Sequence, residues 1–212
     1  MMKKIGVLVS GGGTNLQAVI DKVHQKSGEI AVVIANKADA YGLVRAENSG
    51  IATEVVLEET FPSCEAFNEK LIEILKAYEV ELVVLAGYMK IITPNFVAAY
   101  PNKIINIHPA LIPSFCGEGY YGMHVHEAVY AYGAKVSGAT VHFVNEEADA
   151  GPIIAQRTVA LEDEDTPEMI QKKVLKIEHV LLPWVVEQYC LGNITVEGRR
   201  VFVGKNKAEE EE

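Results

Sequence analysis

The segment Ile5-Gly6-Val7-Leu8-Val9-Ser10-Gly11-Gly12-Gly13-Thr14-Asn15-Leu16 decides the predicted fold. Its first five residues are apolar and β-prone, but too few for the core of a signal peptide, and they predict a first strand. The glycines that follow permit the positive φ angles of a tight turn. A helical pattern over residues 15–26 comes next, so the chain opens with strand, glycine turn and helix.

The same alternation continues along the chain. Strands are predicted at residues 29–35, 53–56, 82–85 and 104–108, and helices at 41–49, 63–78 and 167–191. Residues 136–144 and 153–159 alternate apolar and polar side chains, as in a mixed or antiparallel continuation. The fold class is therefore α/β: a Rossmann-like, mostly parallel sheet with helices on both faces and a mixed or antiparallel edge. Ligands of such sheets bind at the carboxyl ends of the strands.

The domain organisation predicted from this pattern is simple. Residues 1–192 are expected to form a single domain, because no repeat or linker interrupts the alternation and 212 residues allow one sizeable core. Residues 193–212 are expected to form a C-terminal hairpin around Glu197-Gly198, followed by a solvated acidic tail at 209–212.

Composition excludes several classes of protein. The chain is 49% apolar, but no apolar run approaches the roughly 20 residues of a membrane helix. A net charge of −10 argues against a nucleic-acid-binding surface. Cys64, Cys116 and Cys190 are odd in number and widely spaced, which predicts neither a disulfide framework nor a zinc site. With no signal-like segment, these cysteines favour the reducing cytoplasm. The sequence leaves monomer and homodimer open.

The glycine loop at residues 10–16 has the features of an anion site. Free N–H groups and the dipole at a helix N-terminus favour a negative charge, and Thr14 and Asn15 can add hydrogen bonds. No Gly-Lys-Ser/Thr ending is present, which excludes a nucleoside-triphosphate P-loop, and Leu16 replaces the third glycine of a dinucleotide loop. One phosphate monoester is the better prediction, although a tight turn without a ligand is equally compatible.

A second candidate site lies at the end of the strand predicted at 104–108. Side chains alternate along a strand, so Asn106 and His108 point the same way at its carboxyl end. An amide can stabilise an oxyanion while an imidazole moves protons, which suits acyl chemistry. No Ser or Cys nucleophile is evident beside them, so direct transfer between two bound substrates is predicted. Taken alone, a histidine at a strand end is more often structural.

An acidic loop, Glu146-Glu147-Ala148-Asp149-Ala150-Gly151-Pro152, joins the two late strands. Such loops are often only solvated turns. A carboxylate brought close to His108 would favour the imidazolium and raise the pKa of His108. Spacing along the chain does not show that the loop reaches it.

Five stretches together carry a family resemblance: Val9–Leu16 around the glycine loop, Leu85-Ala86-Gly87-Tyr88-Met89-Lys90, residues 105–113 with Asn-Ile-His-Pro, Gly138-Ala139-Thr140-Val141-His142-Phe143-Val144, and Asp149-Ala150-Gly151-Pro152-Ile153-Ile154. Over roughly residues 3–192 the chain resembles the phosphoribosylglycinamide formyltransferases. The Asn-Ile-His-Pro block is common to folate-dependent formyltransferases, whereas the glycine loop is more specific to this branch.

The resemblance implies transfer of the formyl group of 10-formyltetrahydrofolate, the co-substrate, to the amine of 5′-phosphoribosylglycinamide, in purine biosynthesis and without a metal. Both partners are small molecules. It implies Asn106, His108 and Asp149 as catalytic residues. The ribonucleotide would be bound by Gly12, Gly13, Thr14, Asn15, Leu175, Lys176, Ile177 and Glu178. The folate would contact Tyr88, Met89, Lys90, Ile91, Ile92, Asn106, Asn145, Glu146, Glu147, Ala148 and Asp149.

Two departures from the family pattern stand out. Cys64 occupies a position near the folate tail where members often have a basic residue. Residues 114–122 form a longer loop than in the shortest members, with three glycines and adjacent tyrosines, which is compatible with a mobile flap or an ordinary surface loop. His142 either lines the pocket or is a core histidine. His124 and His126 lack an obvious third ligand for a metal.

Rival functions remain at this point. A 10-formyltetrahydrofolate hydrolase would be expected to carry an additional N-terminal domain, and a formyltransferase acting on methionyl-tRNA an additional C-terminal domain and a basic surface. A non-catalytic binder of a phosphorylated metabolite would use the glycine loop alone and leave the Asn106–His108 pair unexplained. A nicotinamide-dependent oxidoreductase is disfavoured by Leu16.

Overall fold

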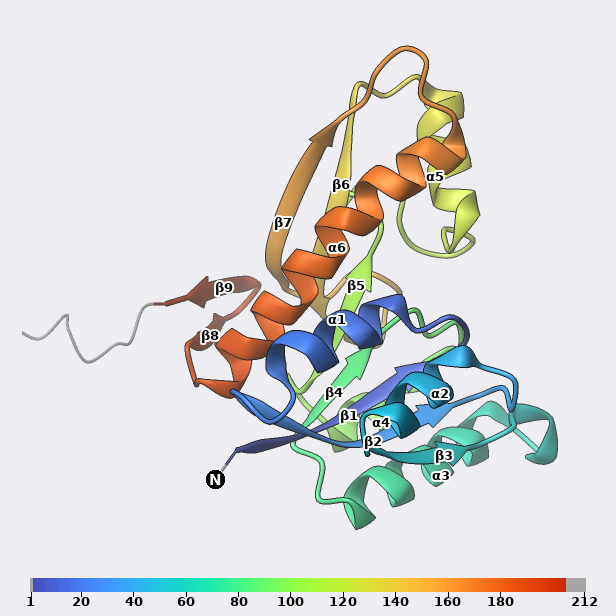
Figure 1. Cartoon of the computed structure of the whole chain (residues 1–212), viewed down its shortest axis with the longest axis vertical. Helices are drawn as coiled ribbons and strands as arrows, with labels where there is room; N and C mark the ends of the chain where they lie inside the picture. Colours follow the sequence, from blue (N-terminus) through green and yellow to red (C-terminus); the bar gives the residue numbers. More distant parts are fainter. Residues whose placement is uncertain (1, 205–212) are drawn as a thin grey trace, which may run out of the picture.

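The computed structural model describes residues 2–204. Within them, seven strands form one sheet in the order β3-β2-β1-β4-β5-β6-β7 (Figure 1). The first five strands along the chain pair in parallel, while β6 and β7 are antiparallel additions beside β5. The strands are β1 (Lys3–Val9), β2 (Gly28–Ala35), β3 (Ala52–Val55), β4 (Leu82–Leu85), β5 (Ile104–His108), β6 (Val136–Phe143) and β7 (Ile153–Ala160).

Helices cover both faces of this sheet, as the apolar strands require. In Figure 1, α1 and α6 lie side by side over one face, and α3 lies across the other. One buried cluster joins α1, α2 and α6 to the sheet, and a second joins α3 and α4 to the opposite face. The helices are α1 (Thr14–Val23), α2 (Tyr41–Asn48), α3 (Cys64–Ala77), α4 (Pro94–Ala99), α5 (Met123–Tyr132) and α6 (Pro167–Cys190), with a 3₁₀ turn, η1, at Glu58–Thr60.

The predicted fold class is confirmed: the sheet is mostly parallel, with an antiparallel edge at β6 and β7. Element ends differ from prediction by a few residues. The first helix ends at Val23 rather than at residue 26, because the chain turns there into β2. Neither the short α4, which begins at Pro94, nor η1 was predicted.

The C-terminal hairpin consists of β8 (Ile194–Glu197) and β9 (Arg200–Val203). Its apolar side chains Ile194, Val196, Val201 and Val203 pack against the same cluster that α1 and α6 cover. The acidic run at residues 209–212 lies outside the described residues. No helix among residues 2–204 is long and apolar enough to cross a membrane.

The strand order places the glycine loop and the end of β5 on the side of the sheet where the parallel strands have their carboxyl ends. β1 lies between β2 and β4, and the chain continues to one side through β2 and β3 and to the other through β4 and β5. The glycine loop therefore leaves the sheet at the topological switch point, two strands from the end of β5.

Candidate active site

The glycine loop turns tightly between β1 and α1. Gly13 has a φ of 67°, and a Cβ added there would lie 2.7 Å from the Cα of Gly42, so this position requires glycine. No side chain caps the N-terminus of α1. Gly11, Gly12 and Thr14 are exposed. The first N–H groups of the helix are therefore open to an anion.

The loop and the last helix meet through a buried pair. The Asn15 Nδ2 donates to Glu178 Oε2 over 2.6 Å. Burial raises the pKa of Glu178, against the opposing effect of the hydrogen bond from Asn15. The Oδ1 atom of Asn15 has no partner among the described residues. Of the other predicted ribonucleotide residues on α6, Lys176 is exposed and Ile177 packs against the core.

The paired strands β5 and β6 bring the amide and imidazole side chains together. Asn106 lies opposite His142, and His108 lies opposite Thr140. The Asn106 Nδ2 lies 3.2 Å from His142 Nε2, while His142 Nδ1 lies 2.8 Å from the carbonyl oxygen of Phe143. When His142 donates from Nδ1 its Nε2 accepts from Asn106, which leaves the second N–H of that amide for a substrate oxygen.

Asp149 completes this cluster from the loop between β6 and β7. Its Oδ2 lies 3.5 Å from His108 Nδ1, and its Oδ1 lies 3.5 Å from His142 Nε2. Its Oδ2 also accepts a 2.9 Å hydrogen bond from the N–H of Gly117. The structure thus brings Asn106, His108 and Asp149 together, although spacing along the sequence did not connect them; their catalytic roles stay predictions.

His108 is held in a nearly closed environment, with a side chain only 4% exposed. Its Nε2 donates to the carbonyl oxygen of Phe115 over 2.8 Å. Burial lowers the pKa of His108 below its usual range, and this effect exceeds the raising effects of Asp149 and Phe115. The sequence-based expectation of a raised pKa is therefore wrong in its net direction, although Asp149 acts as expected.

Asp149 itself remains an acceptor. Burial favours the neutral acid, but the nearby imidazole of His142, the charge of His108 and the hydrogen bond from the N–H of Gly117 together lower the pKa of Asp149. The lowered pKa keeps the Asp149 carboxylate ionised beside the two imidazoles.

The segment after β4 offers an apolar surface beside this cluster. Met89 is 49% exposed and Ile91 is 75% exposed. The N–H of Met89 donates to Ser10 Oγ over 2.8 Å, which ties the segment to the end of β1. Ile92 packs against the core instead. Tyr88 and Asn145 each bury a polar oxygen without a partner in the described chain, while residues 146–148 are exposed.

A model of the formyl transferase family matches residues 3–186. The chain belongs to that family. The phosphoribosylglycinamide formyltransferase of Haemophilus influenzae is 40% identical over 204 residues, which cover 95% of this chain and 94% of that protein. The enzyme of the same name from Escherichia coli is 40% identical over 192 residues, covering 90% and 88%.

Solved formyl transferase structures agree with the fold. The crystal structure of glycinamide ribonucleotide transformylase 1 from Symbiobacterium toebii superposes with a TM-score of 0.91 at 42% identity, covering 96% of this chain and 95% of that one. The likeness extends over the parallel strands and the antiparallel edge alike, so the formyl transferase fold accounts for both halves of the sheet.

Two kinds of group in the site of this formyl transferase carry little or no sequence signal: a side chain on β6 and main-chain groups of the loop after β5. The sequence does not decide whether His142 lies in the pocket or in the core, but strand alternation puts it on the same face as Thr140, and the pairing with β5 makes this the face of Asn106 and His108. The main-chain groups of Phe115 and Gly117 give no sequence signal, because almost every residue carries a backbone carbonyl and N–H, whatever its side chain. His126 is buried, and burial followed by the charge of His108 lowers the pKa of His126 to about 4.

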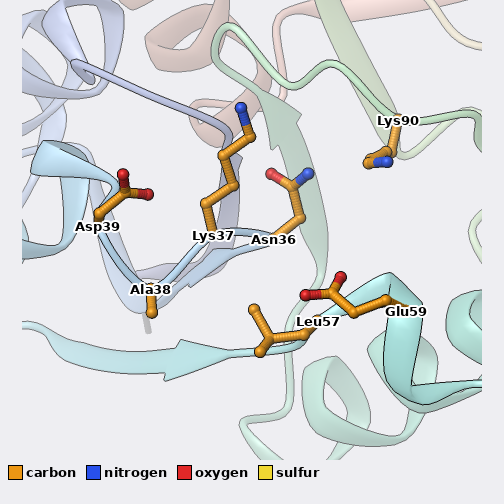
Figure 2. A pocket seen from close by; sticks show the side chains of 7 residues that line it. All are labelled: Asn36, Lys37, Ala38, Asp39, Leu57, Glu59 and Lys90. Atoms are coloured by element: carbon orange, nitrogen blue, oxygen red, sulfur yellow. The ribbon is translucent and has the colours of Figure 1, made fainter.

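Other chemistry finds less support in the described residues. His124 lies 3.5 Å from Glu127, and no group of three or more His, Cys, Asp or Glu side chains within residues 2–204 is placed to hold a metal. A hollow of about 400 Å³ lies beyond the ends of β2 and β3 (Figure 2). Lys90, a predicted folate residue, lines this hollow, but it pairs with Glu58. The catalytic candidates lie elsewhere.

Proposed function

We propose that the chain transfers the formyl group of 10-formyltetrahydrofolate to the amine of 5′-phosphoribosylglycinamide, giving N-formyl-phosphoribosylglycinamide and tetrahydrofolate. The observation that carries this proposal is the cluster of Asn106, His108 and Asp149 at the carboxyl edge of the sheet, next to a glycine loop that can hold one phosphate. The proposal places the reaction in the cytoplasm, in a single domain over residues 1–192 with a C-terminal extension.

The chemistry follows from the groups present. The free amine attacks the formyl carbon, a C–N bond forms, and negative charge develops on the formyl oxygen. The free N–H of Asn106 donates a hydrogen bond to that oxyanion, and the positive charge of the protonated His108 imidazole stabilises it. Asp149 keeps His108 oriented and favours its protonated form against burial. One proton leaves the attacking amine and one reaches N10 of the folate, whose bond to the formyl carbon then breaks.

The ribonucleotide and folate are assigned to two sides of this cluster. The phosphate of the ribonucleotide binds the N–H groups of Gly12, Gly13 and Thr14, and the ribose hydroxyls reach the Asn15–Glu178 pair. The folate lies on the apolar surface of Met89 and Ile91. Both ligands then meet at Asn106, which a direct transfer requires.

The decisive experiment is an assay with both substrates. Loss of 10-formyltetrahydrofolate is followed with and without glycinamide ribonucleotide. Amine-dependent loss with formation of the formylated ribonucleotide supports the transferase. Loss that does not need the amine supports a hydrolase, and binding of the ribonucleotide without loss of the folate supports a non-catalytic binder. Asn106→Ala should lower turnover on the order of 10²–10³-fold without unfolding the protein. A near-normal rate would contradict the assignment.

A further inference from the structure

Arg45 on α2 packs directly against the glycine loop. Its Nε donates to the carbonyl oxygen of Gly12 over 2.8 Å, and its Nη1 donates to Gln17 Oε1 over 3.2 Å. The guanidinium also stacks over the ring of Tyr41, 5.0 Å from the ring centroid. Arg45 thus bridges α2, the loop and the first turns of α1.

This contact fixes which way the loop peptides face. The carbonyl of Gly11 accepts from the N–H of Gly42 over 3.0 Å, so two successive loop carbonyls point toward α2. In a trans peptide the C=O and the following N–H point in opposite directions. The N–H groups of Gly12 and Gly13 therefore face away from α2, and neither has an acceptor among residues 2–204.

The charge of Arg45 is not balanced by an acid. No carboxylate of the described chain lies within ion-pair distance of it. Asp21 enters the network only through Gln17, whose Nε2 donates to it over 2.9 Å. His179 responds to the same positive field: after burial, the charge of Arg45 is the next cause that lowers the pKa of His179. A half-buried cation without a counter-ion favours an anionic ligand nearby.

We propose that Arg45 is a positioning residue that makes this site selective for a phosphorylated amine. It holds the Gly12 carbonyl toward α2, so that the N–H groups of Gly12 and Gly13 converge on the phosphate, and its charge supports the dianion. This inference rests on the proposed function for the identity of the substrate, and it adds a residue outside the loop that sets substrate preference.

The test compares the phosphorylated substrate with the corresponding riboside that lacks the phosphate. Arg45→Met should raise KM for glycinamide ribonucleotide on the order of 10- to 100-fold, the range for losing hydrogen bonds made by a charged group. KM for 10-formyltetrahydrofolate and kcat/KM for the riboside should stay within about twofold, because only binding of the phosphate is lost. Arg45→Lys should recover part of the selectivity, since it keeps the charge without the planar donor pair.

The matched control is Arg200→Met, which removes an arginine that stacks on Phe202 in the distant hairpin. Equal losses with phosphorylated and unphosphorylated substrate in Arg45→Met, or no change with either, would overturn the inference. Should Arg45→Met fail to fold, Gln17→Met removes the acceptor of Nη1 and must show a smaller, equally selective rise in KM. Calorimetry with inorganic phosphate separates this inference from the proposed function, because weaker binding in Arg45→Met is expected even without formyl transfer.

Discussion

The parallel and antiparallel halves of the sheet build their sites from different materials. In the parallel half, the loop after β1 presents main-chain N–H groups at the start of α1, and its residues are neighbours in sequence. In the antiparallel half, β5, β6 and two loops each contribute one or two groups to a cluster around His108. The first site is local, whereas the second depends on how distant segments pack.

This difference determines how each half responds to change. The glycine loop can accept a small added side chain where it faces solvent, as at Gly12, although not at Gly13, which packs against Gly42. A cluster held between antiparallel strands has little free space, because backbone atoms pack directly on one another. Substitutions of glycine by alanine in the two halves give the sharpest way to break the comparison.

The largest effect is expected at Gly151, in the loop that carries Asp149. A Cβ added there would lie 1.7 Å from the carbonyl oxygen of Phe143, a backbone atom that cannot move aside. Gly151→Ala should therefore cost about 3 kcal/mol or more of the free energy of unfolding. At Gly12 a Cβ would meet no atom within 4 Å, and Gly12→Ala should change stability by about 0.5 kcal/mol or less. Urea unfolding of both variants checks the contrast, and equal costs would contradict it.

The next largest effect concerns the charge inside the antiparallel cluster. Asp149→Asn keeps the shape of the side chain but removes the charge that raises the pKa of His108, so burial would lower that pKa further. If the imidazolium is the active form, turnover falls as pH rises through this pKa, and the fall should begin at lower pH in the variant. Near neutral pH we expect a loss on the order of 10²-fold. An unchanged pH midpoint would show that Asp149 does not act through His108.

The comparison also explains what the sequence could predict. The strand, glycine turn and helix that open the chain were predictable, apart from the exact end of the helix, because periodicity and turn chemistry are local. The facing of Asn106 and His108 followed from strand alternation alone. The approach of Asp149 to His108 did not, because it depends on the pairing of β6 with β5 and on a φ of 53° at Asp149.

Other features were beyond local pattern altogether. The pKa of His108 is lowered because several elements together bury its side chain, and this burial cannot be inferred from any single stretch of the sequence. The carbonyl of Phe115 is available to His108 only because the loop after β5 folds back over the strand end. The short helix α4 was missed despite a proline at its start, because six residues carry too little periodicity.

A smaller effect should follow from loosening that loop. Phe115 has a φ of 51°, and its ring packs edge-on against Tyr132 at 5.7 Å and against Tyr120 at 6.5 Å between centroids. Phe115→Ala removes this packing and frees the carbonyl that accepts from His108. We expect kcat to fall roughly 3- to 10-fold, with a lower pKa in its pH profile and an unchanged KM for the ribonucleotide. Tyr121→Ala, which removes a ring contact with His124 in the same loop region, is the control, and a matching pH shift there would count against the idea.

The smallest effect is expected on Tm, and it concerns Glu178 in the predicted ribonucleotide site. Burial raises the pKa of Glu178 in the folded protein above its value in the unfolded chain, so folding favours the protonated acid. Stability from this group is present at low pH and is lost as pH rises through the folded-state pKa. Glu178→Gln should therefore raise Tm at neutral pH, by about 2–4 °C for each kcal/mol gained in a chain of this size. The gain should vanish at acidic pH.

A second carboxylate provides the opposite sign and hence the control. The pKa of Asp165 is lowered, first by the hydrogen bond from Lys173 and then by the N–H of Glu162. Its stabilising contribution is present above the unfolded-state pKa and is lost on acidification, so Asp165→Asn should lower Tm at neutral pH. Only Glu178→Gln should also raise KM for glycinamide ribonucleotide. If both variants shift Tm in the same direction, or if KM rises in both, Glu178 has only a structural role. The alternative that these results would contradict is a carboxylate without a cationic partner that is retained to bind the ribonucleotide.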